Sequence, residues 1–232
     1  MKLENHIALV TGGGRGIGRA TCLALAKEGA DIITIARTQS EINEVRKIVE
    51  SMGRRSLAIR TDIRNESDVS DMVSKSIEHF GTIDILVNNA GVGVRKPLIE
   101  TSMEEFDAVM DVNVRGLFMC TKYVLPHMLR QGRGKVINIS SGAGKTGIEE
   151  LSVYSASKFA VIGLTESLAR EMTGRVGVYA VCPGGVDTQM RRSLYHDRPS
   201  LKPEDVAGRI MELCLPESSV PSGSCVMIYS NG

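Results

Sequence analysis

Short runs of β-branched and other apolar residues alternate with longer amphipathic segments along almost the whole chain. Each run has only four or five residues, which is typical of a buried strand and too short for a helix. Because parallel strands need crossover connections, this alternation predicts a doubly wound α/β domain, with a mostly parallel seven-stranded sheet and helices on both faces. The predicted strands are residues 7–10, 32–36, 56–60, 83–87, 135–139, 177–181 and 225–229, and the predicted helices lie near 16–28, 40–52, 67–80, 103–130, 153–173 and 203–214.

Residues that start and stop helices support these boundaries. Thr38 with Glu41, and Thr101 with Glu104, have the spacing of a capping box. Pro126 lies inside a helical pattern, and we expect it to kink or shorten that helix.

Length and composition predict a single globular domain that covers residues 1–232. The chain has 232 residues, 42% of them hydrophobic, which is enough for one sizeable core and short for two. Lys and Arg together number 28 and Asp and Glu 27, so the formal charge is +1. A near-neutral chain without a basic run argues against a nucleic-acid-binding protein.

Cysteine, histidine and hydropathy patterns indicate the environment of the protein. The five cysteines form no CxxC pair and lie mostly in apolar segments, so we expect free buried thiols in a reducing compartment. No apolar stretch approaches the ~20 residues that cross a bilayer, and residues 1–6 do not resemble a secretory leader. The four histidines have no metal-ligand spacing. The sequence therefore predicts a soluble, cytoplasmic protein without a metal site or a membrane partner.

A glycine-rich turn joins the first predicted strand to the first predicted helix. Residues 11–18 read Thr-Gly-Gly-Gly-Arg-Gly-Ile-Gly, with the spacing GxxxGxG rather than GxGxxG. A helix N-terminus directly behind a strand and a glycine turn directs free N–H groups and the positive end of the helix dipole toward one point. The pyrophosphate of a dinucleotide fits there, and a purely structural turn is the alternative.

Basic residues near this turn indicate which dinucleotide binds. A dehydrogenase that prefers NAD usually has an acidic residue after the second strand, which binds the ribose 2′-hydroxyl. Here that strand ends at Ala36 and is followed by Arg37, and Arg15 lies within the glycine turn. A guanidinium suits a 2′-phosphate because it is always charged and bonds two oxygens at once. The sequence therefore predicts NADP(H) in preference to NAD(H), with ordinary surface arginines as the alternative.

A tyrosine and a lysine stand at the start of the predicted helix near residue 153. Tyr154 and Lys158 are four residues apart and so share one helix face. An ammonium close to a phenol favours the phenolate, and we expect Lys158 to lower the pKa of Tyr154 from ~10. A phenol with a lowered pKa can act as a general acid or base near neutral pH. Such a pair is common, so its meaning depends on its neighbours.

Polar residues also lie near the carboxyl ends of predicted strands, where an open parallel sheet binds its ligands. Ser140 and Ser141 end the fifth strand, and a hydroxyl there can hydrogen-bond a carbonyl oxygen. Asp62 ends the third strand, where it can accept a hydrogen bond from an adenine amino group or cap the next helix. Asn113 stands between two valines in a helical segment, which suggests that it bonds backbone or water.

Taken together, these segments resemble the classical short-chain dehydrogenase/reductase family. Residues 11–18 match its TGxxxGxG motif, residues 88–91 (Asn-Asn-Ala-Gly) match its NNAG motif, and residues 183–188 match its PGxxxT segment. The motifs occur in the family's order. The resemblance implies a Rossmann-type fold, and within the family it is closest to the 3-oxoacyl-(acyl-carrier-protein) reductases.

Four residues match the family's Asn-Ser-Tyr-Lys tetrad: Asn113, Ser141, Tyr154 and Lys158. Ser141 is a better match than Ser140 because it lies thirteen residues before Tyr154. The resemblance implies that Tyr154 donates a proton to the substrate carbonyl oxygen, or removes one from an alcohol, and that Ser141 holds that oxygen. It also implies that Lys158 binds the nicotinamide-ribose hydroxyls, and that Asn113 places a water linking Lys158 to solvent.

The resemblance further implies a set of cofactor contacts. In the family, the glycines let the backbone approach the cofactor, the second Asn of the NNAG motif lies near the adenosine ribose, and the PGxxxT segment orients the carboxamide. With the two arginines, Asp62 and the Tyr-Lys pair, the predicted cofactor residues are Gly12, Arg15, Gly16, Ile17, Gly18, Arg37, Asp62, Ile63, Asn89, Tyr154, Lys158, Val186 and Thr188.

The predicted activity is NADP(H)-dependent interconversion of a carbonyl and a secondary alcohol by hydride transfer. The resemblance favours a 3-oxoacyl-(acyl-carrier-protein) reductase, with a sugar, polyol or general carbonyl reductase as the alternative. The substrate is expected to be a small molecule or to be carrier-bound. A dinucleotide-binding regulator without catalysis is the alternative of another class, and the complete tetrad argues against it.

Two further expectations concern the rim of the site and the assembly. Residues 189–202 should form a short charged lid, either a solvated loop or a contact for an anionic substrate, with Arg191, Arg192, His196, Asp197 and Arg198. Glu149 and Glu150 should lie in a solvated loop at the rim. Helical segments 103–130 and 153–173 carry apolar residues on more than one face, which predicts a homotetramer or homodimer; examples are Val109, Val112, Leu117, Phe118, Val124, Leu125, Phe159, Ile162 and Leu164.

Overall fold

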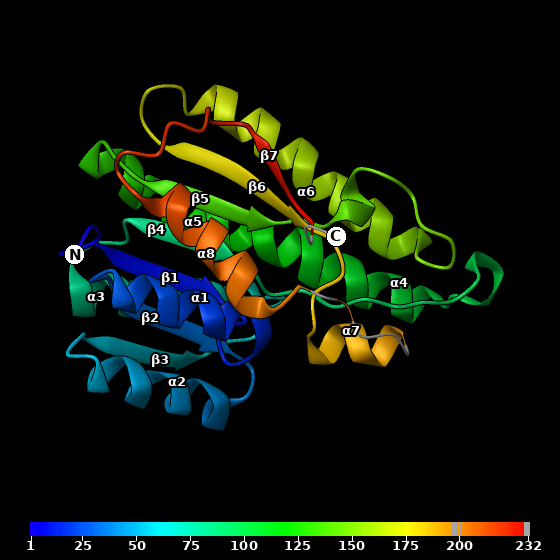
Figure 1. Ribbon diagram of the computed structural model, residues 1–232, viewed down its shortest axis with the longest axis horizontal. Helices are drawn as coiled ribbons and strands as arrows, with labels where there is room; N and C mark the ends of the chain where they lie inside the picture. The colour runs from blue at the N-terminus through cyan, green and yellow to red at the C-terminus, as the bar shows by residue number, and fades with distance from the viewer. Residues whose placement is uncertain (196–198, 200, 230–232) are drawn as a thin grey trace.

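The computed structural model describes residues 1–195, 199 and 201–229 (Figure 1). Within these residues the strands are β1 (Ile7–Thr11), β2 (Asp31–Ala36), β3 (Ser56–Arg60), β4 (Ile85–Asn88), β5 (Lys135–Ile139), β6 (Gly177–Pro183) and β7 (Cys225–Ile228). They form one parallel sheet in the order β3-β2-β1-β4-β5-β6-β7. The predicted fold class is therefore confirmed. The order reverses between β1 and β4, which opens a crevice beyond the carboxyl ends of these two strands.

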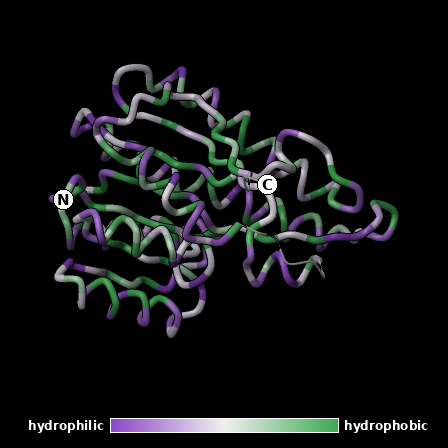
Figure 2. Tube along the Cα trace, viewed as in Figure 1, coloured by the Kyte–Doolittle hydropathy of each residue, from purple (hydrophilic) through white to green (hydrophobic). Residues whose placement is uncertain are grey.

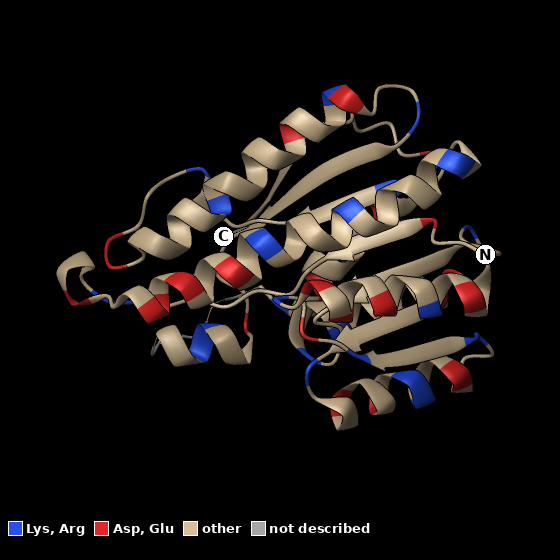
Figure 3. Cartoon of the chain, turned by 180° about the vertical axis from the view of Figure 1, so that it is seen from behind, with Lys and Arg blue, Asp and Glu red and all other residues tan. Residues whose placement is uncertain are grey.

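Helices cover both faces of this sheet. They are α1 (Gly16–Lys27), α2 (Gln39–Ser51), α3 (Glu66–Phe80), α4 (Met103–Met110), α5 (Leu117–Gln131), α6 (Ser152–Glu171), α7 (Gln189–Leu194) and α8 (Pro203–Cys214), with the shorter η1 (Leu98–Glu100), η2 (Asp111–Gly116) and η3 (Gly142–Gly144). In Figure 1, α1, α2 and α8 lie in front of the sheet. Figure 3, from behind, shows α3, α4, α5 and α6 on the other face, with most charged residues on helices and connections rather than on strands.

The two faces of the strands pack into two separate hydrophobic clusters. Ala8 and Val10 of β1 belong to the cluster under α1 and α8, whereas Ile7 and Leu9 belong to the cluster under α3 and α5. Successive side chains of a strand point to opposite faces, so a sheet covered on both sides needs continuous apolar strands. That requirement explains the uninterrupted apolar runs in the sequence. Figure 2 shows the same pattern: the hydrophobic strands lie between the helical layers, and the helices carry hydrophilic residues on their outer faces.

The predicted helix at 103–130 is interrupted where no break was expected. α4 ends at Met110, the π-helical segment η2 follows, and α5 then runs past Pro126 to Gln131. Of the two predicted effects of Pro126, a kink or a shortened helix, the shortening is wrong, because the helix stops only at Gly132, whose φ of 73° is left-handed. A π-helical turn inserts an extra residue and often marks a functional position.

Two details of helix capping also differ from the prediction. The capping box of α4 is formed by Ser102 and Glu105, one residue later than predicted, because Thr101 and Ser102 are both extended and Ser102 is the last extended residue before the helix. Thr38 is the N-cap of α2 but makes no side-chain capping bond. A sequence pattern predicts where a helix starts to within one or two residues, whereas the N-cap is the last residue before the helix whose backbone is not helical.

The segment expected as a charged lid contains the short helix α7, which the sequence analysis did not predict. Its N-cap is Thr188, whose Oγ1 accepts a hydrogen bond from the Arg191 backbone N–H at 3.2 Å. His196, Asp197 and Arg198, named in the prediction, lie outside the described residues.

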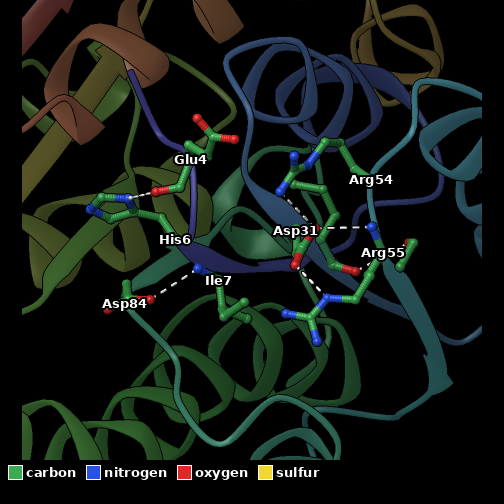
Figure 4. A network of polar contacts seen from close by, with 9 residues as sticks. Glu4, His6, Ile7, Asp31, Arg54, Arg55 and Asp84 are labelled. Carbon is green, nitrogen blue, oxygen red and sulfur yellow. Dashed lines mark hydrogen bonds and ion pairs between the residues drawn. The ribbon is translucent and has the colours of Figure 1, made fainter. Parts of the chain in front are cut away.

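Ion pairs and hydrogen bonds connect the segments at the edge of the sheet where the strands begin (Figure 4). Asp31, at the start of β2, is buried and pairs with Arg55 Nε at 2.7 Å and with Arg54 Nη2 at 3.2 Å. Asp84 Oδ2 accepts a hydrogen bond from the backbone N–H of Ile7 at 3.0 Å. This edge is opposite the glycine turn, so we assign these charges a structural role.

Candidate active site

A cavity of about 880 Å³ opens at the carboxyl ends of the strands. It is lined by the glycine turn, by the segments after β2 to β6, and by parts of α6 and α7. In Figure 1 the arrowheads of the strands point toward this region, with α7 beyond them. The position is the crevice in which doubly wound sheets bind their ligands. Every predicted cofactor residue except Gly18 lines it: Gly12, Arg15, Gly16, Ile17, Arg37, Asp62, Ile63, Asn89, Tyr154, Lys158, Val186 and Thr188.

The glycine turn needs its glycines for two different reasons. Gly12 and Gly16 line the cavity with left-handed backbones, at φ 62° and 54°, a conformation that favours glycine. Gly18 lies inside α1 and is not among the cavity residues. A Cβ atom at Gly18 would stand 2.3 Å from the carbonyl oxygen of Gly12, so this glycine lets α1 pack against the turn. Gly18 is therefore needed for the packing of α1 and does not form a wall of the cavity.

Asp62 and Arg37 lie at one end of the cavity, near the end of β2. The Asp62 carboxylate accepts hydrogen bonds from Arg64 Nε at 3.0 Å and Arg64 Nη2 at 2.6 Å. This hydrogen bonding by Arg64 holds the pKa of Asp62 below its usual range. An adenine amino group would thus meet a carboxylate that is already ionised and paired with an arginine.

Arg15 contacts two cavity residues, Gln189 and Glu41, that were not predicted to belong to the site. Its Nη1 donates to Gln189 Oε1 at 2.7 Å and lies 3.6 Å from Glu41 Oε1. Glu41 is in the first turn of α2, beyond the position directly after β2 at which an acid indicates a preference for NAD, so that pattern does not identify it. This end of the cavity therefore holds Arg15, Arg37 and one carboxylate that pairs with Arg15.

Tyr154, Ser141 and Lys158 meet at the other end of the cavity. Tyr154 and Lys158 lie one turn apart on α6, and Ser141 is the N-cap of η3, where its Oγ accepts a hydrogen bond from the Ala143 backbone N–H at 3.2 Å. Burial raises the pKa of the Tyr154 phenol, a hydrogen bond with Ser141 acts in the opposite direction, and the nearby Tyr195 raises it further.

The expected lowering of the Tyr154 pKa by Lys158 is therefore wrong. Lys158 is buried, its Nζ donates to the Ile139 carbonyl oxygen at 2.9 Å, and it stands 5.7 Å from the centre of the Tyr154 ring. Burial lowers the pKa of Lys158 to about 8. A lysine with a pKa near 8 is already neutral at the higher pH where the Tyr154 phenol titrates. The removal of the phenol from water therefore dominates the pKa of Tyr154.

Asn113 lies in η2 next to this site, but it does not line the cavity. It is 1% exposed. Its Oδ1 accepts from the Val92 backbone N–H at 2.9 Å, and its Nδ2 donates to the Val92 carbonyl oxygen at 2.9 Å and to Ser157 Oγ at 3.0 Å. The prediction that Asn113 bonds backbone is thus confirmed. Both amide protons are in use, and one acceptor position on Oδ1 remains for a further partner.

Two polar residues outside the predicted set of site residues, Ser140 and Asn88, support this arrangement. Ser140 Oγ donates to the Lys158 carbonyl oxygen at 2.9 Å, so Ser140 anchors α6 and Ser141 borders the substrate space. Asn88 Nδ2 donates to Thr121 Oγ1 and to Asn138 Oδ1, both at 2.9 Å, and so joins β4 to α5 and β5. These contacts join residues 18 to 50 positions apart, so spacing along the chain gives no signal of them.

The cavity fits a dinucleotide. Beside Gly16, a Cβ atom would meet nothing nearer than Thr188 Cγ2 at 3.4 Å, so the backbone of the turn is open to a ligand. Arginines at one end suit phosphate, and at the other end Lys158 Nζ is a buried donor beside Tyr154. Among the described residues, no group of three His, Cys, Asp or Glu side chains is placed to hold a metal ion. Within the same residues, every helix is too short or too polar to cross a membrane.

Comparison with known proteins agrees with this geometry. The family pattern described as short chain dehydrogenase matches residues 6–199. A 3-oxoacyl-(acyl-carrier-protein) reductase of Thermotoga maritima is 34% identical over 240 residues, covering 98% of each chain. Another from Synechocystis sp. is 38% identical over 219 residues, covering 90% of this chain and 88% of the relative.

Solved structures give the same result. The crystal structure of levodione reductase matches with a TM-score of 0.90 at 30% identity, covering 98% of this chain and 97% of the other. A putative short-chain alcohol dehydrogenase from Sinorhizobium meliloti 1021 matches with a TM-score of 0.92 at 31% identity, covering 97% and 95% of the two chains. The chain therefore belongs to the short-chain dehydrogenase/reductase family, the oxidoreductases that use NAD(P) to interconvert carbonyl and alcohol groups.

Proposed function

We propose that this protein is an NADP(H)-preferring reductase of 3-oxoacyl groups carried on an acyl carrier protein. The cofactor preference rests mainly on Arg37, which stands on the cavity directly after β2, where an NAD-preferring enzyme usually has an acid. The substrate class rests on the two relatives of that name, each aligned over most of this chain.

The proposed chemistry divides the work between the cofactor and the protein. A bound NADPH supplies the hydride from its nicotinamide. Tyr154 donates its proton to the carbonyl oxygen of the substrate, and Ser141 hydrogen-bonds the same oxygen. Lys158 hydrogen-bonds the ribose hydroxyls and, when protonated, favours the Tyr154 phenolate that remains. Asn113 acts as a positioning residue, because it ties Val92 to Ser157, and the water that it was predicted to place would use its remaining acceptor position.

The cofactor preference is tested by exchanging the charge at the end of β2. In the double variant Ala36→Asp, Arg37→Ser, we expect the ratio of kcat/KM for NADPH over NADH to fall by roughly 10²-fold, since charge-assisted hydrogen bonds are worth about 1.5–3 kcal/mol each. Arg46→Ser is the matched control, because Arg46 pairs with Glu50 on α2 and lies outside the cavity. A wild-type preference for NADH, or an unchanged ratio in the double variant, would contradict the proposal.

The substrate class is tested with acetoacetyl-(acyl carrier protein) and NADPH, followed by the loss of nicotinamide absorbance. The likeness to levodione reductase favours a second candidate, a reductase of free ketones. Levodione, the diketone for which that reductase is named, therefore forms the second arm of the assay. A higher kcat/KM for the carrier-bound substrate supports the first proposal, and a higher value for the free diketone supports the second.

We further propose a single domain that assembles as a homodimer or homotetramer. Many of the apolar residues that predicted an interface are instead buried within their own chain, among them Val109, Val124 and Ile162. Phe118 on α5 and Phe159 on α6 remain about half exposed, at 51% and 46%. These two rings carry the interface proposal, because large exposed aromatic side chains on neighbouring helices favour association.

A further inference from the structure

Arg95, in the segment after β4, contacts two other segments at the substrate end of the cavity. Its Nε donates to Glu150 Oε2 at 2.8 Å, in the segment before α6. Its Nη1 stands 3.5 Å from the Leu194 carbonyl oxygen at the end of α7, and its Cζ lies 4.2 Å from the centre of the Tyr195 ring. One guanidinium thus joins three segments that are far apart in the sequence.

The ring of Tyr195 is held by two guanidinium groups. Arg191 Cζ lies 3.4 Å from its centre, and Arg95 Cζ supplies the second contact. Tyr195 and Arg191 both line the cavity. A cation near an aromatic ring is attracted by the ring's quadrupole, so two such contacts restrict where the ring can lie. Tyr195 is therefore a positioned wall of the substrate space.

A glycine brings the end of α7 close to Tyr154. At Gly93 an added Cβ atom would lie 3.0 Å from Leu194 Cδ1 and 3.3 Å from Tyr154 Cδ2. Any side chain at this position would push Leu194 and the Tyr154 ring apart. The close approach of α7 agrees with the contribution of Tyr195 to the raised pKa of Tyr154.

Glu150, which takes part in the same contacts, has a left-handed backbone conformation. Its φ of 63° is left-handed, which is unfavourable for a residue other than glycine. Its carbonyl oxygen accepts a hydrogen bond from the Lys96 backbone N–H at 2.8 Å, and its side chain binds Arg95. The prediction that Glu150 lies in a solvated loop is therefore incomplete, because two bonds tie it to the segment after β4. Strained backbone persists where surrounding contacts compensate for it.

We propose that Arg95, Glu150 and Tyr195, here called the Arg95 latch, hold α7 over Tyr154 and so determine the size of the carbonyl substrate that the cavity accepts. Arg95 acts as a positioning residue and Tyr195 as a specificity-determining wall. The Arg95–Glu150 ion pair involves partly exposed side chains, and such ion pairs and ring contacts are individually weak, so we expect the latch to open for substrate entry. The size selection rests on the proposed carbonyl reduction, whereas the latch itself does not.

The latch can be tested without a substrate by hydrogen–deuterium exchange of the full chain. In Arg95→Ala and in Tyr195→Leu, we expect the amides of residues 191–195, at the end of α7, to exchange roughly fivefold faster than in the wild type. Arg95→Lys should be intermediate, because it keeps a cation and loses the planar fork. The matched control is Lys96→Ala, since Lys96 pairs with Glu105 on α4, away from the cavity. Unchanged exchange in Arg95→Ala, or equal acceleration in the control, would overturn the proposal.

Kinetics test the size selection with ethyl acetoacetate and the bulkier ethyl benzoylacetate. We expect the wild type to prefer the smaller ketone, and Arg95→Ala to reduce the ratio of the two kcat/KM values roughly fivefold through KM, with the Kd of NADPH unchanged. An equal loss of kcat/KM with both ketones, or a loss of NADPH affinity of the same size, would show that Arg95 supports the structure in general and does not select substrate size. If the wild type reduces neither ketone and no acyl-carrier-protein substrate, the proposed function fails, and the exchange experiment still decides whether the latch exists.

Discussion

Replacing Lys158 by methionine should change how the stability of the protein depends on pH. Lys158 is 4% exposed, and burial lowers its pKa to about 8, from 10.5 in an exposed lysine. Below pH 8 the side chain is protonated in both the folded and the unfolded chain, so burial of the charged ammonium lowers the free energy of unfolding by its full amount. Between about pH 8 and 10.5 the unfolded chain binds more protons than the folded chain, so the contribution of Lys158 to stability rises with pH.

The size of this change follows from the two pKa values. At about 1.4 kcal/mol per pKa unit, the shift corresponds to about 3 kcal/mol across the window. The methionine variant also loses the bond to the Ile139 carbonyl oxygen, which shifts its stability by a constant amount at every pH. Burial raises the pKa of Cys22 to about 12, so this thiol lowers stability at high pH, equally in both proteins.

The assay is urea unfolding of both proteins without cofactor at pH 7, 8, 9 and 10. The difference between the two free energies of unfolding should move in favour of the wild type by about 2–3 kcal/mol from pH 7 to pH 10. In a thermal melt this is on the order of 5–10 °C for a chain of this length. Parallel pH profiles would show that Lys158 is not desolvated as its burial implies, and would refute the reasoning.

Three other substitutions test the site and the assembly. Tyr154→Phe should reduce turnover by roughly 10²–10⁴-fold with little change in NADPH affinity, measured by fluorescence titration, because the phenol is the proposed proton donor; turnover close to wild type would remove that role. Asn113→Ala should lower the free energy of unfolding in urea by about 2–4 kcal/mol, since it leaves buried groups of Val92 and Ser157 without partners, and a change below about 0.5 kcal/mol would contradict the positioning role. Phe118→Glu should lower the mass measured by light scattering from that of an oligomer, and a monomeric wild type would refute the proposed interface.

Much of the fold and the composition of the site could be read from the chain alone. Buried strands need continuous apolar runs, and helices need apolar residues every three to four positions, so the order of β1 to β7 is visible in local spacing. The glycine turn and the pair Tyr154 and Lys158 are also local patterns, since neighbours on a turn or on one helix face lie within a few residues of each other.

Only the tertiary structure decided how these groups interact. The pairing of Arg15 with Glu41, the contact of Arg95 with Glu150 and Tyr195, and the π-helical turn at Asn113 all depend on residues brought together by packing. The pKa of Tyr154 rises rather than falls for the same reason. Spacing places a lysine near a phenol, but burial within the folded chain removes water from both groups, which raises the pKa of Tyr154 and lowers that of Lys158.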